Sequence, residues 1–362
     1  MQNTQPASRN ARAPGELELI GRIRSRASAS HGSGLALGIG DDCALLRPRA
    51  GEDLAVTTDL SVDGRHFELS TYPADAVGHR TLARGLSDLA AMGARPVAAF
   101  LSLGLPRELA RTPRRSSGSG SEAGSRSWLD RFLDGFLALA AEHKAPLAGG
   151  DLAESPLAAA DIVLIGSVPR GRALLRSGAR AGDTIYVTGA LGGAAAGLAK
   201  LAEWAESAGR RPTGLRVTGK IPQRLTALLA PHLYPQPRIA QGQWLMRRRV
   251  ATAAIDISDG ISTDLAHLCE ESGLAAEIDA GALPLHPGAN LAQALHGGED
   301  YELLFTAPAE VRLPRAIAGV AVTRIGRMAQ ARKGRPRVAL LTAKGLEPLE
   351  PRGWQHFAPG DH

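Results

Sequence analysis

Hydrophobic positions recur along the chain at two spacings, one typical of helices and the other of buried strands. Helical spacing is found over residues 16–27, 75–96 and 128–143. Continuous apolar runs that predict buried strands are found over residues 97–106 and 161–169. The second helical stretch stops at Gly93, with Pro96 just beyond it, which is the punctuation expected at a helix C-terminus. Because strands and helices alternate in both halves, the sequence predicts an α/β or α+β fold.

The character of the chain changes near residues 171–182, and we expect two domains. Residues 183–205 combine a strand, a glycine-rich turn and a long alanine-rich helix, which is typical of the opening of a second domain. Further helices are predicted around residues 222–230 and 239–249. The expected organisation is a tail over residues 1–15, an N-terminal domain over 16–170 with a Ser/Gly/Arg-rich insertion at 111–127, and a C-terminal domain over 171–362. The insertion has almost no apolar residues, so we expect it to be a mobile surface segment.

Composition narrows the class of protein. The chain has 362 residues, 44% of them hydrophobic and 22% charged, and no apolar run approaches the roughly 18 residues that span a bilayer. The first fifteen residues are polar and lack the apolar segment of a secretory signal, so we expect a disordered tail. Two cysteines, Cys43 and Cys269, cannot build a disulfide framework or a structural zinc site. We therefore expect a reducing, cytoplasmic location and no membrane contact.

The positive charge raises the question of nucleic-acid binding. The net charge is +6 and the pI is about 9.7. However, the arginines are spread along the chain, and aromatic residues make up only 4% of it, too few for base-stacking platforms. We predict no nucleic-acid partner, and we expect the charge to help in binding small anions.

Carboxylates follow apolar runs on small-residue turns in five places. These acids are Asp41 and Asp42, Asp59, Asp88, Asp151, and Asp256 with Asp259. Each one alone fits an ordinary helix cap or turn former. As a set they suggest convergence at one end of an α/β sheet, where their repulsion would need cations. Oxygen ligands favour Mg²⁺, with Thr57 and Thr58 as further donors. Asp264, on the following helix, fits a capping or surface carboxylate better.

Mg²⁺ held by carboxylates is usually bound by substrate phosphates as well, so an anion-binding turn is expected nearby. Paired glycines at 149–150 and 297–298 allow a ligand to approach the backbone closely. Residues 189–193 (GALGG) open a helix and fit either an anion site or close strand–helix packing. Arg176 is a candidate phosphate clamp. The near-Walker stretch 214–221 is rejected because Ile221 stands where a Ser or Thr hydroxyl must reach Mg²⁺.

Seven motifs occur in one order between residues 38 and 303. They are GIGDDCALL, TTDLSVDGRHF, LSDLAAMGARP, GGD, GRALLRSGARAGDTIYVTG, IDISDG and GGEDYEL. Together they closely resemble the thiamine-monophosphate kinases, a family of the aminoimidazole-ribonucleotide-synthetase-like ATP-binding superfamily. The resemblance implies a two-domain synthetase-like fold, with an N-terminal domain that forms a homodimer through its sheet and a C-terminal α/β domain. It also implies ATP as co-substrate, several Mg²⁺ ions, and thiamine monophosphate as acceptor.

The resemblance also implies roles for single residues. The implied metal ligands are Asp42, Thr57, Thr58, Asp59, Asp88, Asp151, Asp256 and Asp259. The implied ATP contacts are Gly150, Arg176 and Ser258, and the implied substrate contacts are His66, Glu299 and Trp354. The phosphate of the acceptor is already ionised, so we expect in-line transfer with no general base and no phosphoenzyme. Two alternatives stay open at this point: a related ATP-dependent enzyme with another acceptor, and a non-catalytic scaffold that binds divalent ions.

Overall fold

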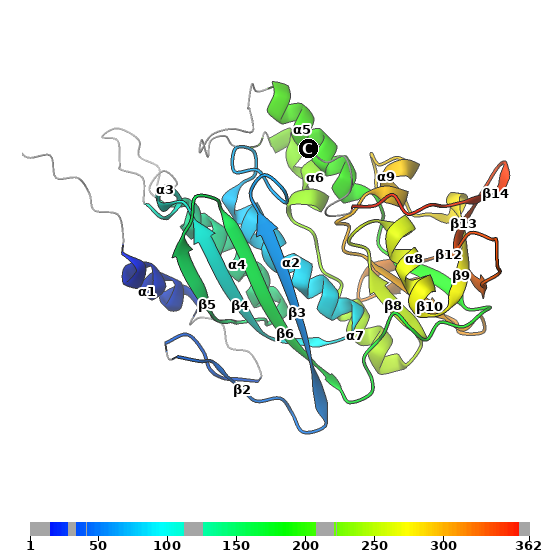
Figure 1. The fold of residues 1–362 in the computed structure, drawn as a ribbon, viewed down its shortest axis with the longest axis horizontal. Helices are drawn as coiled ribbons and strands as arrows, with labels where there is room; N and C mark the ends of the chain where they lie inside the picture. The colour runs from blue at the N-terminus through cyan, green and yellow to red at the C-terminus, as the bar shows by residue number, and fades with distance from the viewer. Residues whose placement is uncertain are drawn as a thin grey trace, which may run out of the picture.

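The computed structural model describes residues 15–27, 34–40, 42–111, 126–207, 221 and 223–354. The expected N-terminal tail up to residue 14, residues 112–125 of the insertion and residues 214–220 of the near-Walker stretch lie outside the described residues. Strands and helices are mixed in both halves, which confirms the predicted α/β class (Figure 1). None of the described helices is long and apolar enough to cross a membrane.

The first half is built on a four-stranded sheet in the order β3-β6-β4-β5. Its strands are β3 (Glu52–Val62), β4 (Arg95–Leu105), β5 (Leu147–Glu154) and β6 (Ala159–Pro169). The β3–β6 and β6–β4 pairs are antiparallel and the β4–β5 pair is parallel. Helices α2 (Ala74–Ala91) and α4 (Trp128–His143) cover one face, which gives the sheet a single helical layer (Figure 1). Strands β3 and β5 are its two edge strands.

Helix α2 ends as the sequence predicts. The N–H of Gly93 donates to the carbonyl of Ala90, and the N–H of Ala94 donates to the carbonyl of Leu89. Gly93 has φ 68°, so these two bonds form the glycine-terminated Schellman motif.

Helix α2 is also the seam between the two halves. Helix α7 (Ile239–Arg248) crosses it so closely that a Cβ on Gly242 would lie 1.9 Å from the carbonyl oxygen of Ala90. Leu86 of α2 belongs to the same buried cluster as Leu245 and Phe305 from the second half. One hydrophobic core therefore runs across the seam, and α2 is buried on nearly every side.

The second half contains a larger mixed sheet in the order β14-β13-β9-β12-β7-β10-β8, with β11 paired to β12. Its strands are β7 (Thr184–Thr188), β8 (Ala253–Asp256), β9 (Leu274–Asp279), β10 (Leu303–Ala307), β11 (Ala316–Ile317), β12 (Val320–Gln330), β13 (Val338–Thr342) and β14 (Gly345–Pro348). The accompanying helices are α5 (Gly193–Ser207), α6 (Gln223–Leu233), α8 (Ile261–Glu271), α9 (Leu291–His296) and the 3₁₀ turn Ala280–Ala282. Leu303 of β10 pairs with Asp256 of β8, which brings the two acidic motifs of this half side by side.

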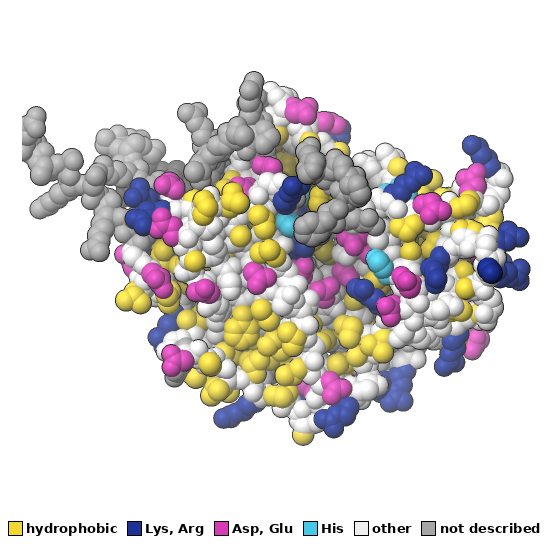
Figure 2. All heavy atoms as spheres, in the orientation of Figure 1, with side chains coloured by type: hydrophobic (Ala, Val, Ile, Leu, Met, Phe, Trp, Pro, Cys, Tyr) yellow, Lys and Arg dark blue, Asp and Glu magenta, His cyan; other side chains and the backbone are white. Residues whose placement is uncertain are grey.

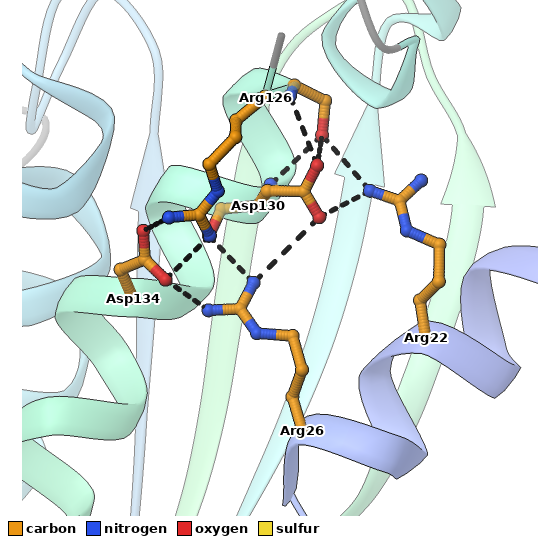
Figure 3. A network of polar contacts seen from close by, with 6 residues as sticks. Arg22, Arg26, Arg126, Asp130 and Asp134 are labelled. Atoms are coloured by element: carbon orange, nitrogen blue, oxygen red, sulfur yellow. Dashed lines mark hydrogen bonds and ion pairs between the residues drawn. The ribbon is translucent and has the colours of Figure 1, made fainter. Parts of the chain in front are cut away.

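An ionic network fixes the N-terminal helix α1 (Glu16–Ala27) to α4 (Figure 3). Arg22 pairs with Asp130, and Arg26 pairs with Asp134. Asp130 also completes a capping box with Ser127, the N-cap of α4. Arg126 pairs with Asp134 as well. The last two residues of the predicted mobile insertion, Arg126 and Ser127, therefore belong to the ordered end of α4.

The other face of the four-stranded sheet carries exposed apolar side chains, visible as a yellow patch in Figure 2. Leu54, Val56 and Leu60, which alternate along β3, are 46%, 60% and 53% exposed. At one end of this face the short strands β1 (Leu35–Leu37) and β2 (Leu45–Leu46) pack over the sheet. We call the remaining part of this face, which carries Leu54, Val56 and Leu60, the open sheet face.

Candidate active site

A cavity of about 680 Å³ lies between the two halves and is lined by both. Its wall from the first half includes Asp59, His66, Tyr72, Arg84 and Asp88. Its wall from the second half includes His232, Asp256, Ser258, Asp259, Glu299 and Trp354. Acids from both halves and the side chains of His66, Tyr72 and His232 therefore face one space.

Strand alternation and helix spacing bring the acids of the first half together. Thr57 and Asp59 are two residues apart on β3, so both point to the face covered by α2. There the hydroxyl of Thr57 donates to the carboxylate of Asp88. Arg84, one turn before Asp88 on α2, pairs with Asp59 at 3.2 Å. In the second half Asp256 ends β8, and the hydroxyl of Ser87 donates to its Oδ2 at 2.6 Å. Side chains of α2 therefore join both groups of acids.

The buried acids are held in an environment that disfavours their negative charge. Burial raises the pKa of Asp59 to about 6, although the Arg84 guanidinium partly offsets this. Burial, and then the charge of Asp88, raise the pKa of Asp256 to about 7. Burial raises the pKa of Asp88 as well. Carboxylates desolvated together in this way are better satisfied by cations than by the protein alone.

Asp264 has a larger role than its position in the sequence predicted. Its Oδ2 accepts hydrogen bonds from the backbone N–H groups of Ser258, Asp259 and Gly260 at 3.1, 3.2 and 3.0 Å. Asp264 is 2% exposed, so the surface reading is wrong, and the carboxylate shapes the loop that carries the predicted ligands. Burial raises its pKa well above the usual range.

The three predicted substrate contacts all line the cavity. The N–H of Val62 donates to Nδ1 of His66 at 3.1 Å, so the neutral ring carries its proton on Nε2. Trp354 is 47% exposed, and its backbone N–H donates to the carbonyl of Asp259 at 3.2 Å. Glu299 pairs with Arg80 at 2.6 Å.

The predicted anion site at GALGG is occupied by the protein's own carboxylate. The N–H groups of Gly192 and Ala194 donate to Asp300 at 2.6 and 3.0 Å. Helix α5 is thus capped by Asp300. The turn is also closely packed, because a Cβ on Gly192 would lie 2.8 Å from the backbone nitrogen of Ala294 on α9.

The remaining predicted ligands lie elsewhere. Asp151 pairs in register with exposed Ser102, whose neighbours Leu101 and Leu103 are buried under the helices. Asp151 therefore projects from the open sheet face, as does exposed Thr58 beside Val56 and Leu60. Strand β5 is three positions from β3, or about 14 Å at the usual strand spacing.

Three further predicted residues lie outside the cavity. Gly150 lies on β5 beside Asp151. Asp42 is exposed in the loop between β1 and β2, and that loop packs near β5, with Gly38 approaching the carbonyl of Ala148. Arg176 is exposed, but its charge lowers the pKa of both Asp88 and Asp256, which places it near the acids.

Comparisons with known proteins identify the family. The family model for the AIR synthase related protein, N-terminal domain, matches residues 40–168, and that for its C-terminal domain matches residues 180–339. A thiamine-monophosphate kinase of Escherichia coli (strain K12) is 39% identical over an alignment of 360 residues, covering 96% of this chain and 99% of the relative. This chain belongs to the thiamine-monophosphate kinase family.

Solved structures of thiamine-monophosphate kinases share the fold. The crystal structure of thiamine-monophosphate kinase from Stenotrophomonas maltophilia K279a is 39% identical, with a TM-score of 0.71, over 89% of this chain and 95% of that one. A structure of AaThiL complexed with AMPPCP and TMP is 31% identical, with a TM-score of 0.67, over 95% of this chain and 97% of that one. The two-domain synthetase-like fold expected from the motifs is confirmed.

Among the described residues, the acids predicted as metal ligands are not gathered into one closed cluster. In the part of the chain that the structure describes, no three His, Cys, Asp or Glu side chains are grouped closely enough to hold a metal ion. Thr57, Ser87 and Arg84 bind the carboxylates of Asp88, Asp256 and Asp59 instead. The donor set nevertheless suits Mg²⁺, because carboxylate and hydroxyl oxygens are the hard ligands that this ion prefers.

Sequence reasoning missed Tyr72, Arg80 and His232. Each is buried and packs around Glu299 or lines the cavity. Their partners lie more than 150 residues away along the chain, so no local pattern signals them.

Proposed function

We propose that this chain transfers the γ-phosphoryl group of ATP to the phosphate of thiamine monophosphate and so forms thiamine diphosphate. The observation that carries the proposal is the cavity between the domains. The buried acids and the three predicted substrate contacts, His66, Glu299 and Trp354, all line it. Membership of the thiamine-monophosphate kinase family supports the same reaction. ATP and thiamine monophosphate are its two substrates.

We also propose Mg²⁺ as the cation that this cavity requires. Asp59, Asp88, Asp256 and Asp259 would hold it on the cavity side, with the hydroxyl of Thr57 fixing Asp88. When bound, Mg²⁺ neutralises the phosphates of donor and acceptor and aligns them for attack. Arg176 and Ser258 would contact the nucleotide. His66, Glu299 and Trp354 would contact the acceptor.

Phosphoryl transfer in this cavity needs positioning more than acid–base chemistry. The attacking oxygen belongs to a phosphate that is already ionised, so no side chain has to remove a proton from it. We therefore propose direct in-line transfer. A phosphorylated residue on the enzyme, or retention of configuration at a chiral γ-phosphorus, would contradict this.

We propose that the functional unit is a homodimer formed through the open sheet face. Leu54, Val56 and Leu60 are large apolar side chains on one face, and their burial by a second copy would remove that surface from water. The same face carries Thr58 and Asp151. A partner packed there would bring its Asp151, Gly150 and Asp42 toward the nucleotide, which accounts for predicted ligands that lie outside the cavity.

Turnover with a defined set of acceptors tests the function. The purified chain is incubated with ATP and MgCl₂, with or without thiamine monophosphate, and ADP and thiamine diphosphate are quantified. We expect ADP release that depends on the acceptor, equals the thiamine diphosphate formed and stops when EDTA removes Mg²⁺. Acceptor-independent ATP hydrolysis, or turnover of another acceptor only, would favour the alternative of a related enzyme. Absence of any turnover would favour the scaffold.

We further propose a cytosolic location. Cys43 and Cys269 are both free, one exposed and one buried, which suits a reducing compartment.

A further inference from the structure

Four side chains from both domains form one cluster at the wall of the cavity. Tyr72, just before α2, places its hydroxyl 2.7 Å from Nε2 of His232 on α6. Nδ1 of His232 lies 3.5 Å from Oε2 of Glu299. Arg80 of α2 closes the ring, because its Nη2 donates to Oε1 of Glu299 at 2.6 Å and its Nη1 donates to the carbonyl of His232. We call these four residues the Glu299 cluster.

The protonation states of the Glu299 cluster follow from its burial. Burial, and then the charge of Arg80, lower the pKa of His232 to about 3, so the imidazole is neutral and carries one proton. Burial raises the pKa of Tyr72 to about 12, so its hydroxyl keeps its proton while it shares a hydrogen bond with Nε2 of His232. Nδ1 of His232 lies 3.4 Å from Nη1 of Arg80 and 3.5 Å from Oε2 of Glu299. Arg80 donates to Glu299 directly and holds its pKa at about 2, so Glu299 is left as an ionised acceptor.

The same carboxylate is fixed from the backbone side. Glu299 has φ 67°, a left-handed conformation that is uncommon for a residue with a side chain. Its N–H donates to the carbonyl of Ser258 at 2.8 Å, and Gly298 leaves no room for a Cβ, which would lie 2.3 Å from that oxygen. Arg80 and His232 are 5% and 1% exposed, whereas the Glu299 side chain is 28% exposed and lines the cavity. The carboxylate thus has a fixed direction and free lone pairs toward the cavity.

We propose that Tyr72, Arg80 and His232 are positioning residues for the acceptor substrate, which hold Glu299 as a fixed hydrogen-bond acceptor for a cationic heterocycle bearing an amino group. This inference rests on the proposed function, in which Glu299 contacts thiamine monophosphate. The thiamine part of that substrate has both features, a thiazolium charge and an aminopyrimidine donor. The side chains of Tyr72, Arg80 and His232 contact Glu299 and one another, whereas Asp59, Asp88 and Asp256 are bound by Arg84, Thr57 and Ser87, so the cluster governs acceptor affinity rather than transfer.

Steady-state kinetics with both substrates varied separate these roles. We expect Arg80→Met to raise KM for thiamine monophosphate by about thirtyfold, while KM for ATP and kcat change less than about threefold. Arg80→Lys should recover part of this loss, because an ammonium donates to Glu299 but cannot also reach the His232 carbonyl as a planar fork does. Tyr72→Phe should raise the acceptor KM about fivefold, because Nε2 of His232 loses its hydrogen-bond partner.

Tyr234→Phe is the matched control. The Tyr234 hydroxyl donates to Asp75 at 2.7 Å across the same seam, and neither residue lines the cavity. We expect its kinetic constants to stay at the wild-type values.

Several outcomes would overturn the inference. One is an equal rise in KM for ATP in the Arg80 or Tyr72 variants, and another is a fall in their kcat at unchanged acceptor KM. A third is the same rise in acceptor KM in Tyr234→Phe, which would mean that the cluster acts only as a contact between the domains. If Arg80→Met does not fold, Arg80→Lys and Tyr72→Phe carry the test. Wild-type enzyme that forms no thiamine diphosphate would refute the proposed function. Active wild type with unaffected variants would refute this inference alone.

Discussion

The GGEDYE motif shows how neighbouring acids acquire different roles at the scale of single residues. Glu299 pairs with Arg80 in the N-terminal half. Asp300 caps α5, and burial raises its pKa to about 7 although the backbone N–H groups partly offset this. Glu302 accepts from Thr188 at 2.6 Å and pairs with Arg238. Three carboxylates within four residues thus contact three different parts of the fold.

The Glu299–Arg80 pair makes stability depend on pH in a predictable direction. Burial alone would raise the pKa of Glu299, but the Arg80 guanidinium outweighs it and holds the pKa at about 2, below the ordinary 4.5. The unfolded chain therefore takes up a proton at higher pH than the native chain does. The stabilisation is complete above about pH 4.5 and is lost as the pH falls through 2.

We expect the gap in unfolding free energy between wild type and Glu299→Gln to shrink by about 2 kcal/mol from pH 7 to pH 3. Urea unfolding of both proteins at each pH measures this gap. Glu347→Gln, at an exposed position of β14, serves as the control and should show a gap that does not change. A constant gap for Glu299→Gln would mean that the carboxylate is not held ionised by Arg80.

At the scale of elements, α1 and the start of α4 depend on one carboxylate. Asp130 accepts from the Ser127 N–H at 3.1 Å and from its hydroxyl at 2.7 Å, and it also pairs with Arg22. Asp134 pairs with Arg26 and Arg126 but takes no part in the cap (Figure 3). Asp130 therefore serves both the helix cap and the ion pairs, whereas Asp134 serves the ion pairs alone.

We expect Asp130→Ala to lower the free energy of unfolding by about 2 kcal/mol, because it removes both a capping partner and ion pairs. Asp134→Ala should cost less than about 1 kcal/mol, because partly exposed pairs contribute little. Thermal unfolding measures the loss, and limited proteolysis within residues 16–27 reports whether α1 separates from α4. Equal losses in the two variants would show that the cap adds nothing.

At the scale of the whole molecule, the predicted ligands fall into two groups. Asp59, Asp88, Asp256 and Asp259 line the cavity, whereas Asp42, Thr58, Gly150 and Asp151 lie on or near the open sheet face and β5. The strand order β3-β6-β4-β5 separates the groups within one chain. Under the proposed dimer, each active site would combine the cavity group of one subunit with Asp151 of the other.

Mixing two inactive variants tests that arrangement. We expect Asp88→Asn and Asp151→Asn each to reduce kcat by at least about a hundredfold while the protein stays folded. Unfolded together and refolded as a mixture, they should recover up to about a quarter of wild-type activity, because half of the dimers are mixed and each has one intact site. Refolding each variant alone is the control. No recovery in the mixture would place Asp151 and Asp88 in the same subunit's site.

The sequence by itself determined the elements and the family. The apolar spacing over residues 16–27 and 128–143 matches α1 and α4, and Gly93 ends α2 as expected. Such signals are local, because helix periodicity, caps and turn glycines depend on residues a few positions apart. The ordered motifs identified the family in the same way.

Tertiary structure alone decided which side chains meet. Tyr72 and His232 are 160 positions apart, and Asp300 reaches Gly192 across 108 positions. The sequence left Asp264 open as a capping or surface carboxylate, and the structure buries it with its side chain accepting from the N–H of Gly260. Asp151 and Asp59 follow the same pattern of an apolar run before an acid, yet they lie on opposite edges of one sheet. Strand order and core packing set these distances, and neither is encoded in the spacing of residues along the chain.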